Sequence, residues 1–248
     1  MTQEPGAPGA IIQVEKLVKA FDLLPVLRKL DLAVVRGEFV ALLGPNGSGK
    51  STLLRLLSGL TKPTSGRITV GGWELPHEAA AVRGQIGMVS HKSLLYENLT
   101  ARENLTFYAR LYNLRAEARR ERIELLLQRV GLARRADDLV RTYSRGMLQR
   151  LSIARALLHD PHVLLFDEPY TGLDQDASAT LDGLLTEAHA DGHTIIMTTH
   201  ELQRAALLAH RAVILSRGVI GYDAPTNGID GHALSGIYTE VTGMANAR

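Results

Sequence analysis

Short apolar runs recur along the chain, and segments with helical spacing separate them. Residues 11–40 alternate apolar and polar positions, with turn signals at Asp22 and Pro25, and this pattern predicts strands of a sheet. Several runs are mainly apolar, as in strands buried on both faces: Phe39–Leu43, Val163–Phe166, Thr194–Thr199 and Ala212–Leu215. Because helical segments lie between these runs, we expect a mostly parallel βα sheet.

Two stretches of the chain depart from this pattern. Residues 61–75 predict a turn followed by a strand and a hairpin, which indicates an antiparallel β-subdomain. Residues 100–131 carry helical periodicity, and Gly131 is a suitable residue for ending a helix. We therefore expect a helical subdomain inserted at about residues 93–158.

The ends of the chain have weaker patterns. Residues 1–10 are rich in Gly, Pro and Ala and are expected to be disordered. The last 25 or so residues show no clear period. These observations predict an α/β domain over residues 11–222, followed by a C-terminal tail at residues 223–248.

Composition narrows the classes of partner. The chain has 248 residues and a net charge of +2 from mixed charges, so nothing indicates a nucleic-acid partner. It has no cysteine, which excludes a disulfide scaffold and a thiolate metal site. No apolar run approaches the ~18 residues of a membrane span, and the N-terminal stretch lacks a signal-peptide core. We therefore expect a cytoplasmic chain that reaches a membrane only through a partner.

The stretch GPNGSGKST is the first candidate site. Gly44, Gly49, Lys50 and Ser51 fit the pattern G-x-x-x-x-G-K-[ST], and they lie between a predicted strand and a predicted helix. Glycines let backbone N–H groups approach phosphate oxygens, and a helix N-terminus adds partial positive charge. In such a loop the lysine reaches the β- and γ-phosphates, and the Ser51 hydroxyl binds Mg²⁺. The predicted nucleotide-binding residues are Gly44, Pro45, Asn46, Gly47, Ser48, Gly49, Lys50, Ser51 and Thr52.

Two carboxylates follow the predicted strand at residues 163–166. Asp167 and Glu168 would lie at the carboxyl end of that strand, where open α/β sheets bind their ligands. Asp167 is placed to hold Mg²⁺, and Glu168 to orient and deprotonate an attacking water. His200 closes another strand and could hydrogen-bond the γ-phosphate. The alternatives are a strand end with solvated acids and a structural histidine.

The stretch YSRGMLQRL contains a helix start. Ser144 precedes Gly146 and a helical run, as an N-cap does. It is either a capped helix and no more, or a second anion site at a helix N-terminus.

The order of these motifs resembles the ATP-binding subunits of ABC transporters over residues 11–222. The resemblance implies a P-loop NTPase fold with an ABC-type ATPase core, ATP and Mg²⁺ as ligands, and hydrolysis that depends on Lys50, Glu168 and His200. It also implies a head-to-tail dimer with a second copy or a paralogue, in which Ser144 and Gly146 contact the γ-phosphate bound by the partner.

The resemblance assigns two further residues. Asp174, in YTGLD, matches the segment at the dimer interface of this family. Phe21, in KAFD, lies where the family places an aromatic ring against adenine.

The sequence departs from the family pattern at two places. The signature stretch usually has L-S-G-G-Q, whereas this chain has Arg145 and Met147 beside the retained Ser144 and Gly146. The family's glutamine ligand of Mg²⁺ falls on His91. A neutral imidazole could bind Mg²⁺ through water, but protonation would oppose it.

Within the family, Val89–Tyr112 and the stretch DEPYTGLD are most similar to the ATPase subunit of the bacterial haem exporter of cytochrome c biogenesis. The stretch YSRGM favours an alternative, a drug- or antibiotic-exporter ATPase. Either assignment implies separate membrane-spanning permease subunits, which hold this chain at the inner face of the cell membrane. A non-transport ABC ATPase is a third possibility, although its translation- and repair-type members carry two ATP-binding halves or long coiled coils.

Overall fold

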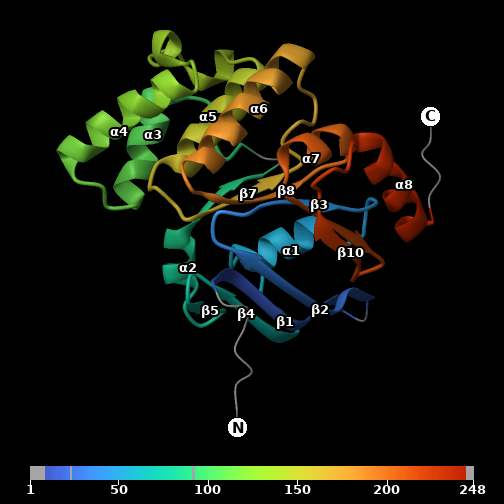
Figure 1. Cartoon of the computed structure of the whole chain (residues 1–248). Coiled ribbons are helices and arrows are strands. Elements are labelled where there is room, and N and C mark those ends of the chain that lie inside the picture. Colours follow the sequence, from blue (N-terminus) through green and yellow to red (C-terminus); the bar gives the residue numbers. More distant parts are fainter. Residues whose placement is uncertain (1–8, 23, 91–92, 244–248) are drawn as a thin grey trace.

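The computed structural model describes residues 9–22, 24–90 and 93–243 (Figure 1). Its strands are β1 (Ala10–Phe21), β2 (Leu24–Val35), β3 (Phe39–Leu43), β4 (Ser65–Val70), β5 (Trp73–Leu75), β6 (Ile86–Val89), β7 (Val163–Asp167), β8 (Thr194–Thr198), β9 (Arg211–Ser216) and β10 (Val219–Pro225). Its α-helices are α1 (Lys50–Leu57), α2 (Ala79–Gln85), α3 (Ala101–Leu111), α4 (Ala116–Arg129), α5 (Arg145–Leu157), α6 (Gln175–Ala190), α7 (Leu202–Leu208) and α8 (Gly231–Thr242).

The larger sheet is mostly parallel, as the apolar runs predict. Among the described residues it has the strand order β10-β9-β3-β8-β7-β6, in which only β10 runs antiparallel to its neighbour. The carboxyl ends of β3, β7 and β8 therefore meet at one edge of the sheet.

Strand β3 shows why the sheet is covered on both faces. Phe39, Ala41 and Leu43 pack into one hydrophobic cluster with the helices α3 to α6, whereas Val40 and Leu42 pack into a second cluster with α1. All five side chains are buried. The uninterrupted apolar run thus follows from burial on both sides of the strand.

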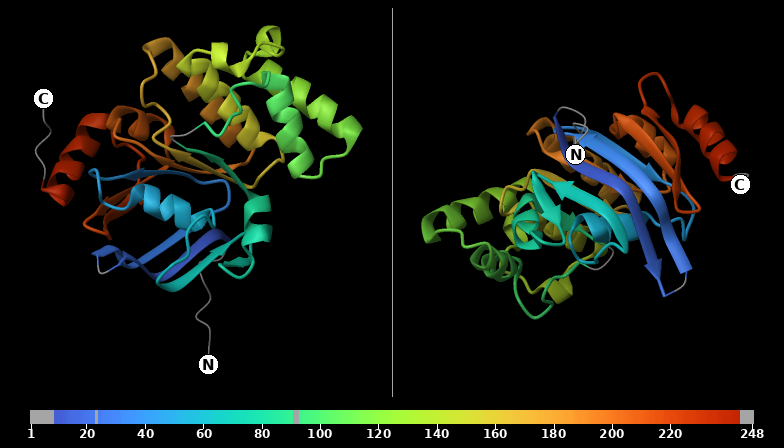
Figure 2. Two further views of the ribbon diagram at one scale, coloured as in Figure 1. Left: turned by 180° about the vertical axis from the view of Figure 1, so that it is seen from behind. Right: turned by 90° about the horizontal axis from the view of Figure 1, so that it is seen from below.

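The smaller sheet covers α1 from the other side. Its order is β2-β1-β4-β5, with antiparallel pairing, and it forms a separate layer across α1 from the larger sheet (Figures 1 and 2). This sheet is the antiparallel β-subdomain predicted from the sequence.

The helices on the opposite face pack closely against the sheet. A Cβ atom at Gly87 of β6 would lie 2.3 Å from the Ala156 carbonyl oxygen of α5, so strand and helix touch backbone to backbone. Helix α4 ends just before Gly131, which has a φ of 66°, as expected for a residue that ends a helix.

The chain after residue 222 differs from the predicted tail. It completes β10 and forms α8, which packs against α7 and β9. Leu234 of α8 is fully buried, and Ile237, Tyr238 and Val241 pack beside it against the core. These positions have helical spacing, and α8 is therefore held to the domain by an ordinary apolar stripe.

Within the described part of the chain, no helix combines the length and the apolar character that crossing a bilayer requires.

Candidate functional site

The loop between β3 and α1 is held by close packing of two glycines. Gly44 and Gly49 have φ values of 147° and 111°, where side chains are strained. A Cβ atom would lie 2.1 Å from the Leu215 carbonyl oxygen at Gly44, and 2.6 Å from Leu27 Cδ2 at Gly49. At Gly47 a Cβ atom would meet nothing within 4 Å. The loop therefore needs glycine at its two ends to rest against β9 and β2.

Lys50 turns back into this loop. Its Nζ donates hydrogen bonds to the carbonyl oxygens of Gly44 (2.7 Å) and Pro45 (3.2 Å), and only 6% of the residue is exposed. Burial lowers the pKa of Lys50, and the nearby charges of Glu168 and Asp167 oppose this effect. The buried Ser48 hydroxyl has no hydrogen-bond partner among the described residues. A buried cation beside an unpaired hydroxyl suits an anionic ligand.

Asp167, at the end of β7, is hydrogen-bonded to the start of α1 and to the end of β8. Its Oδ1 accepts hydrogen bonds from Ser51 Oγ and from Thr198 Oγ1, each at 2.9 Å. Thr198 Oγ1 in turn accepts a 2.9 Å hydrogen bond from the Glu168 backbone N–H. The Ser51 hydroxyl and the Asp167 carboxylate are oxygen donors of the kind that Mg²⁺ prefers, so the residues present fit this ion.

Glu168 has a constrained backbone and a crowded carboxylate. Its φ of 51° lies in the left-handed region, which is uncommon for a side-chain-bearing residue. Glu168 Oε1 lies 4.0 Å from Lys50 Nζ and 2.9 Å from His200 Nε2. The buried Oε1 has no hydrogen-bond partner among the described residues, despite this short distance to His200.

The surroundings shift the pKa values of Glu168 and His200. Burial raises the pKa of Glu168, and the charge of Lys50 partly opposes this shift. Burial and then the charge of Lys50 lower the pKa of His200, which favours the neutral imidazole. Burial thus favours the uncharged form of both Glu168 and His200.

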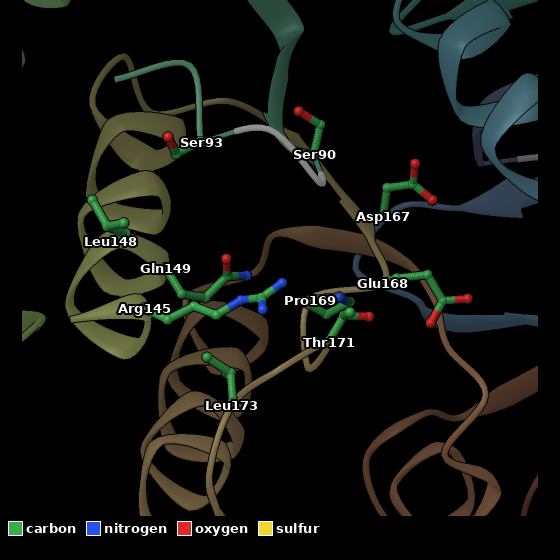
Figure 3. Close-up of a pocket in the computed structure, with 10 residues that line it drawn as sticks. All are labelled: Ser90, Ser93, Arg145, Leu148, Gln149, Asp167, Glu168, Pro169, Thr171 and Leu173. Carbon is green, nitrogen blue, oxygen red and sulfur yellow. The ribbon is translucent and has the colours of Figure 1, made fainter. Parts of the chain in front are cut away.

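Two cavities adjoin the carboxylates. One, of about 370 Å³, is lined by Asn46, Ser51, Asp167, Glu168, Thr171 and His200. The other, of about 150 Å³, lies between α5 and the loop after β7 (Figure 3). In that view the side chains of Arg145 and Gln149 point from α5 toward Pro169 and Thr171.

The remaining predicted residues lie at the starts of helices or away from the group formed by Lys50, Ser51, Asp167, Glu168 and His200. Ser144 begins α5 and its Oγ accepts a hydrogen bond from the Met147 N–H at 3.3 Å. Asp174 caps α6 in the same way through the Ala177 N–H, at 2.7 Å. A Cβ atom at Gly146 would lie 3.0 Å from the Cβ of Ala177, so the two helix starts are in contact.

The other predicted site residues are Thr52, Phe21 and His91. Thr52 lies in the first turn of α1, next to Ser51. Phe21 ends β1, half exposed, with Lys19 Nζ 4.7 Å from the centre of its ring. His91 lies outside the described residues.

Thr198 belongs to the candidate site, although the sequence patterns do not indicate this. Thr198 bridges the Asp167 carboxylate and the Glu168 backbone, although it appeared only as part of a strand. The available signal was a hydroxyl two residues before His200 at the end of an apolar run.

Comparison with known proteins gives consistent matches. A family model described as "ABC transporter" matches residues 27–171. The linearmycin resistance ATP-binding protein LnrL of Bacillus subtilis (strain 168) is 36% identical, over 84% of this chain and 67% of its own length. The daunorubicin resistance ATP-binding protein DrrA3 of Streptomyces coeruleorubidus is 41% identical, over 84% of this chain and 66% of its own length. The chain thus spans about two thirds of the length of these relatives.

A solved structure extends the comparison to the fold. It is the dimeric structure of a post-hydrolysis state of the ATP-binding cassette MJ0796 bound to ADP and Pi. It superposes with a TM-score of 0.80 at 29% identity, and the match covers 88% of this chain and 100% of that one.

The raised pKa of Glu168 predicts a pH-dependent cost in stability. The folded chain binds a proton at this carboxyl more tightly than the unfolded chain does, so stability is lost as pH rises through the folded pKa. We expect Glu168→Gln, without nucleotide, to raise the free energy of unfolding near pH 8. The gain should shrink as pH falls toward the ordinary carboxyl pKa of about 4.3. Urea unfolding across this pH range measures the difference, with Glu121→Gln on the exposed surface of α4 as control. Equal stability of wild type and Glu168→Gln at all pH values would contradict the effect of burial.

Proposed function

Because the chain belongs to the ABC transporter family, as an ATP-binding subunit, we propose that it drives an exporter whose membrane-spanning subunits are separate chains. The chain is an ABC-type ATPase, with the P-loop fold of that family. The observation that carries the assignment of its site is the meeting of Lys50, Ser51, Asp167 and Glu168 at one edge of the parallel sheet.

We propose that ATP binds along the loop of residues 44–52. Lys50 would turn from the loop carbonyls toward the β- and γ-phosphates, and the loop N–H groups would bind phosphate oxygens. Ser51 and Asp167 would hold Mg²⁺, and their 2.9 Å hydrogen bond supports this because it brings two oxygen donors to one point. When bound, Mg²⁺ neutralises charge on the phosphates.

Hydrolysis needs a base and a group that senses the γ-phosphate. Glu168 would orient a water and accept its proton, a role that the raised pKa of this carboxyl supports. His200, whose lowered pKa favours the neutral imidazole, lies 2.9 Å from Glu168 and would hydrogen-bond the γ-phosphate. Lys50 would stabilise the charge that develops on the transferred phosphoryl group.

A second copy of the chain would complete the site. Ser144 and Gly146 begin a helix whose N-terminus suits an anion, and they would contact the γ-phosphate bound by the partner. Asp174 would lie at the interface between the copies, since it begins the helix that touches Gly146. ATP would then hold two copies together, and loss of the γ-phosphate would let them separate.

Two sites remain as proposals from the family resemblance. The exposed ring of Phe21 would stack on adenine, and its exposure leaves the ring accessible. His91 would take the place of a glutamine near Mg²⁺, in its neutral form.

We propose that the membrane-spanning partner contacts the segment Leu94–Asn98. Leu94 and Tyr96 are exposed, as are Phe107 and Leu111 of the adjoining α3. The Tyr96 and Phe107 rings lie 5.0 Å apart, edge to face. An exposed group of apolar side chains of this kind is typical of an interaction site.

For the cargo, the relatives favour a drug- or antibiotic-type molecule, because the two described above are named for resistance to linearmycin and daunorubicin. Haem export is the second candidate. It rests on the resemblance of Val89–Tyr112 to the haem-exporter ATPase, and neither relative is named for that function.

Glu168→Gln tests the chemistry directly. The amide keeps the shape of the side chain but accepts no proton, so we expect hydrolysis to fall at least about 100-fold while ATP still binds. Phosphate release and fluorescent-ATP titration measure the two properties. Hydrolysis at the wild-type rate would remove Glu168 from its proposed role.

Purification of the chain from native membranes, with mass spectrometry of its partners, tests the transport function. We expect a drug-exporter type of permease. Haem-exporter membrane subunits would favour the second candidate, whereas ribosomal or DNA-repair proteins without any membrane protein would overturn the transport proposal.

A further inference from the structure

A hydrogen-bonded network lies behind the two loops that carry Glu168 and His200. The Tyr170 hydroxyl donates a 2.7 Å hydrogen bond to Asp182 Oδ1. The guanidinium of Arg204 pairs with the other oxygen of Asp182 and donates a 2.6 Å hydrogen bond to Glu201 Oε2. Arg204 also lies over the Tyr170 ring, 4.8 Å from its centre. The four side chains thus form one connected group.

The network joins parts of the chain that are far apart in sequence. Tyr170 lies two residues after Glu168 in the loop after β7, and Glu201 directly follows His200 after β8. Asp182 lies on α6 and Arg204 on α7, two helices that cover the same face of the large sheet (Figure 1). The two loops are therefore tied together through these helices, outside the proposed ATP site.

We propose that Tyr170, Asp182 and Arg204 are positioning residues for hydrolysis, which hold the Glu168 loop and the His200 loop in one fixed arrangement. This inference rests on the roles proposed above for Glu168 and His200. No group of the network itself touches the reacting atoms.

Burial makes the network strong. Tyr170 is almost fully buried, and Asp182 and Arg204 are each about four-fifths buried. Hydrogen bonds to a charged partner in such surroundings are stronger than those at the surface. Burial, the hydrogen bond to Asp182 and its charge raise the pKa of Tyr170, so the hydroxyl stays protonated and donates. Loss of one member leaves a polar atom of its neighbour without that partner, which costs free energy in buried surroundings.

The Glu168 loop needs such support. The left-handed backbone of Glu168 is a strained conformation that persists only when its surroundings hold it. The Glu168 N–H is fixed by Thr198, but the loop beyond it has its next side-chain anchor at Tyr170. The His200 side chain is 45% exposed, and its neighbour Glu201 is anchored to Arg204.

Arg129 provides a matched control. It lies on α4, pairs with Glu187 at 3.1 Å and with Asp191 at 2.6 Å, and its side chain is 21% exposed against 22% for Arg204. Both arginines bind one carboxylate on α6, but the Arg129 pairs lie away from the two loops. Replacing Arg129 therefore removes an equivalent interaction without touching the proposed positioning.

The test is steady-state ATP hydrolysis by the full chain and its variants, with thermal unfolding measured for each. We expect Tyr170→Phe and Arg204→Ala to lower kcat by roughly 10- to 100-fold, with KM for ATP unchanged within about twofold, because a misplaced catalytic group costs rate rather than binding. Arg204→Lys should recover part of the loss. Tyr170→Phe should add little in the Arg204→Ala background.

Arg129→Ala should lower the unfolding temperature as much as Arg204→Ala but leave kcat near wild type. Wild-type kcat in Tyr170→Phe and Arg204→Ala would overturn the proposal, as would an equal loss of kcat in Arg129→Ala. Glu168→Gln, measured beside these variants, separates the positioning role of the network from the role of Glu168 as the base. Wild-type activity of Glu168→Gln would overturn the role of Glu168.

Discussion

The Asp167 carboxylate is the point on which the site depends. One of its oxygens accepts hydrogen bonds from Ser51 and Thr198. The three residues lie at the ends of three different elements. Parallel strands make this possible, because their carboxyl ends meet at the same edge of the sheet. The start of α1, the end of β7 and the end of β8 are therefore fixed against one another before any ligand binds. Glu168 follows directly, and its backbone N–H is held by the same Thr198.

Much of this arrangement could be predicted from the sequence, because it depends on local pattern. The apolar run of β3 and the loop with Lys50 and Ser51 lie side by side in the chain, and the carboxylates end a second apolar run. Other features could not be predicted, because they join distant residues. Gly44 must be glycine because the Leu215 carbonyl lies behind it, a contact that no local motif contains.

Contacts between distant residues also explain why three further features were not predicted from the sequence. Thr198 appeared only as a strand residue because its partners lie 30 residues away or more. Helix α8 buries a stripe of only four apolar side chains, Leu234, Ile237, Tyr238 and Val241, which is too short a pattern to predict a helix from the sequence. The link from Tyr170 to Arg204 passes through Asp182 on a third element, so no spacing in the sequence indicates it. Pairing between separate elements is thus the part of the site that only the structure supplies.

Mixing two inactive variants tests most directly whether two copies build each ATP site. Glu168→Gln removes the proposed base, and Ser144→Arg blocks the helix start proposed to face the partner's nucleotide. Each homodimer then lacks an intact site, whereas each mixed dimer has one. A head-to-tail pair predicts that hydrolysis returns on mixing, to about a quarter of the wild-type rate if the sites act independently. No recovery in a mixture shown to contain mixed dimers would contradict a site shared between two copies.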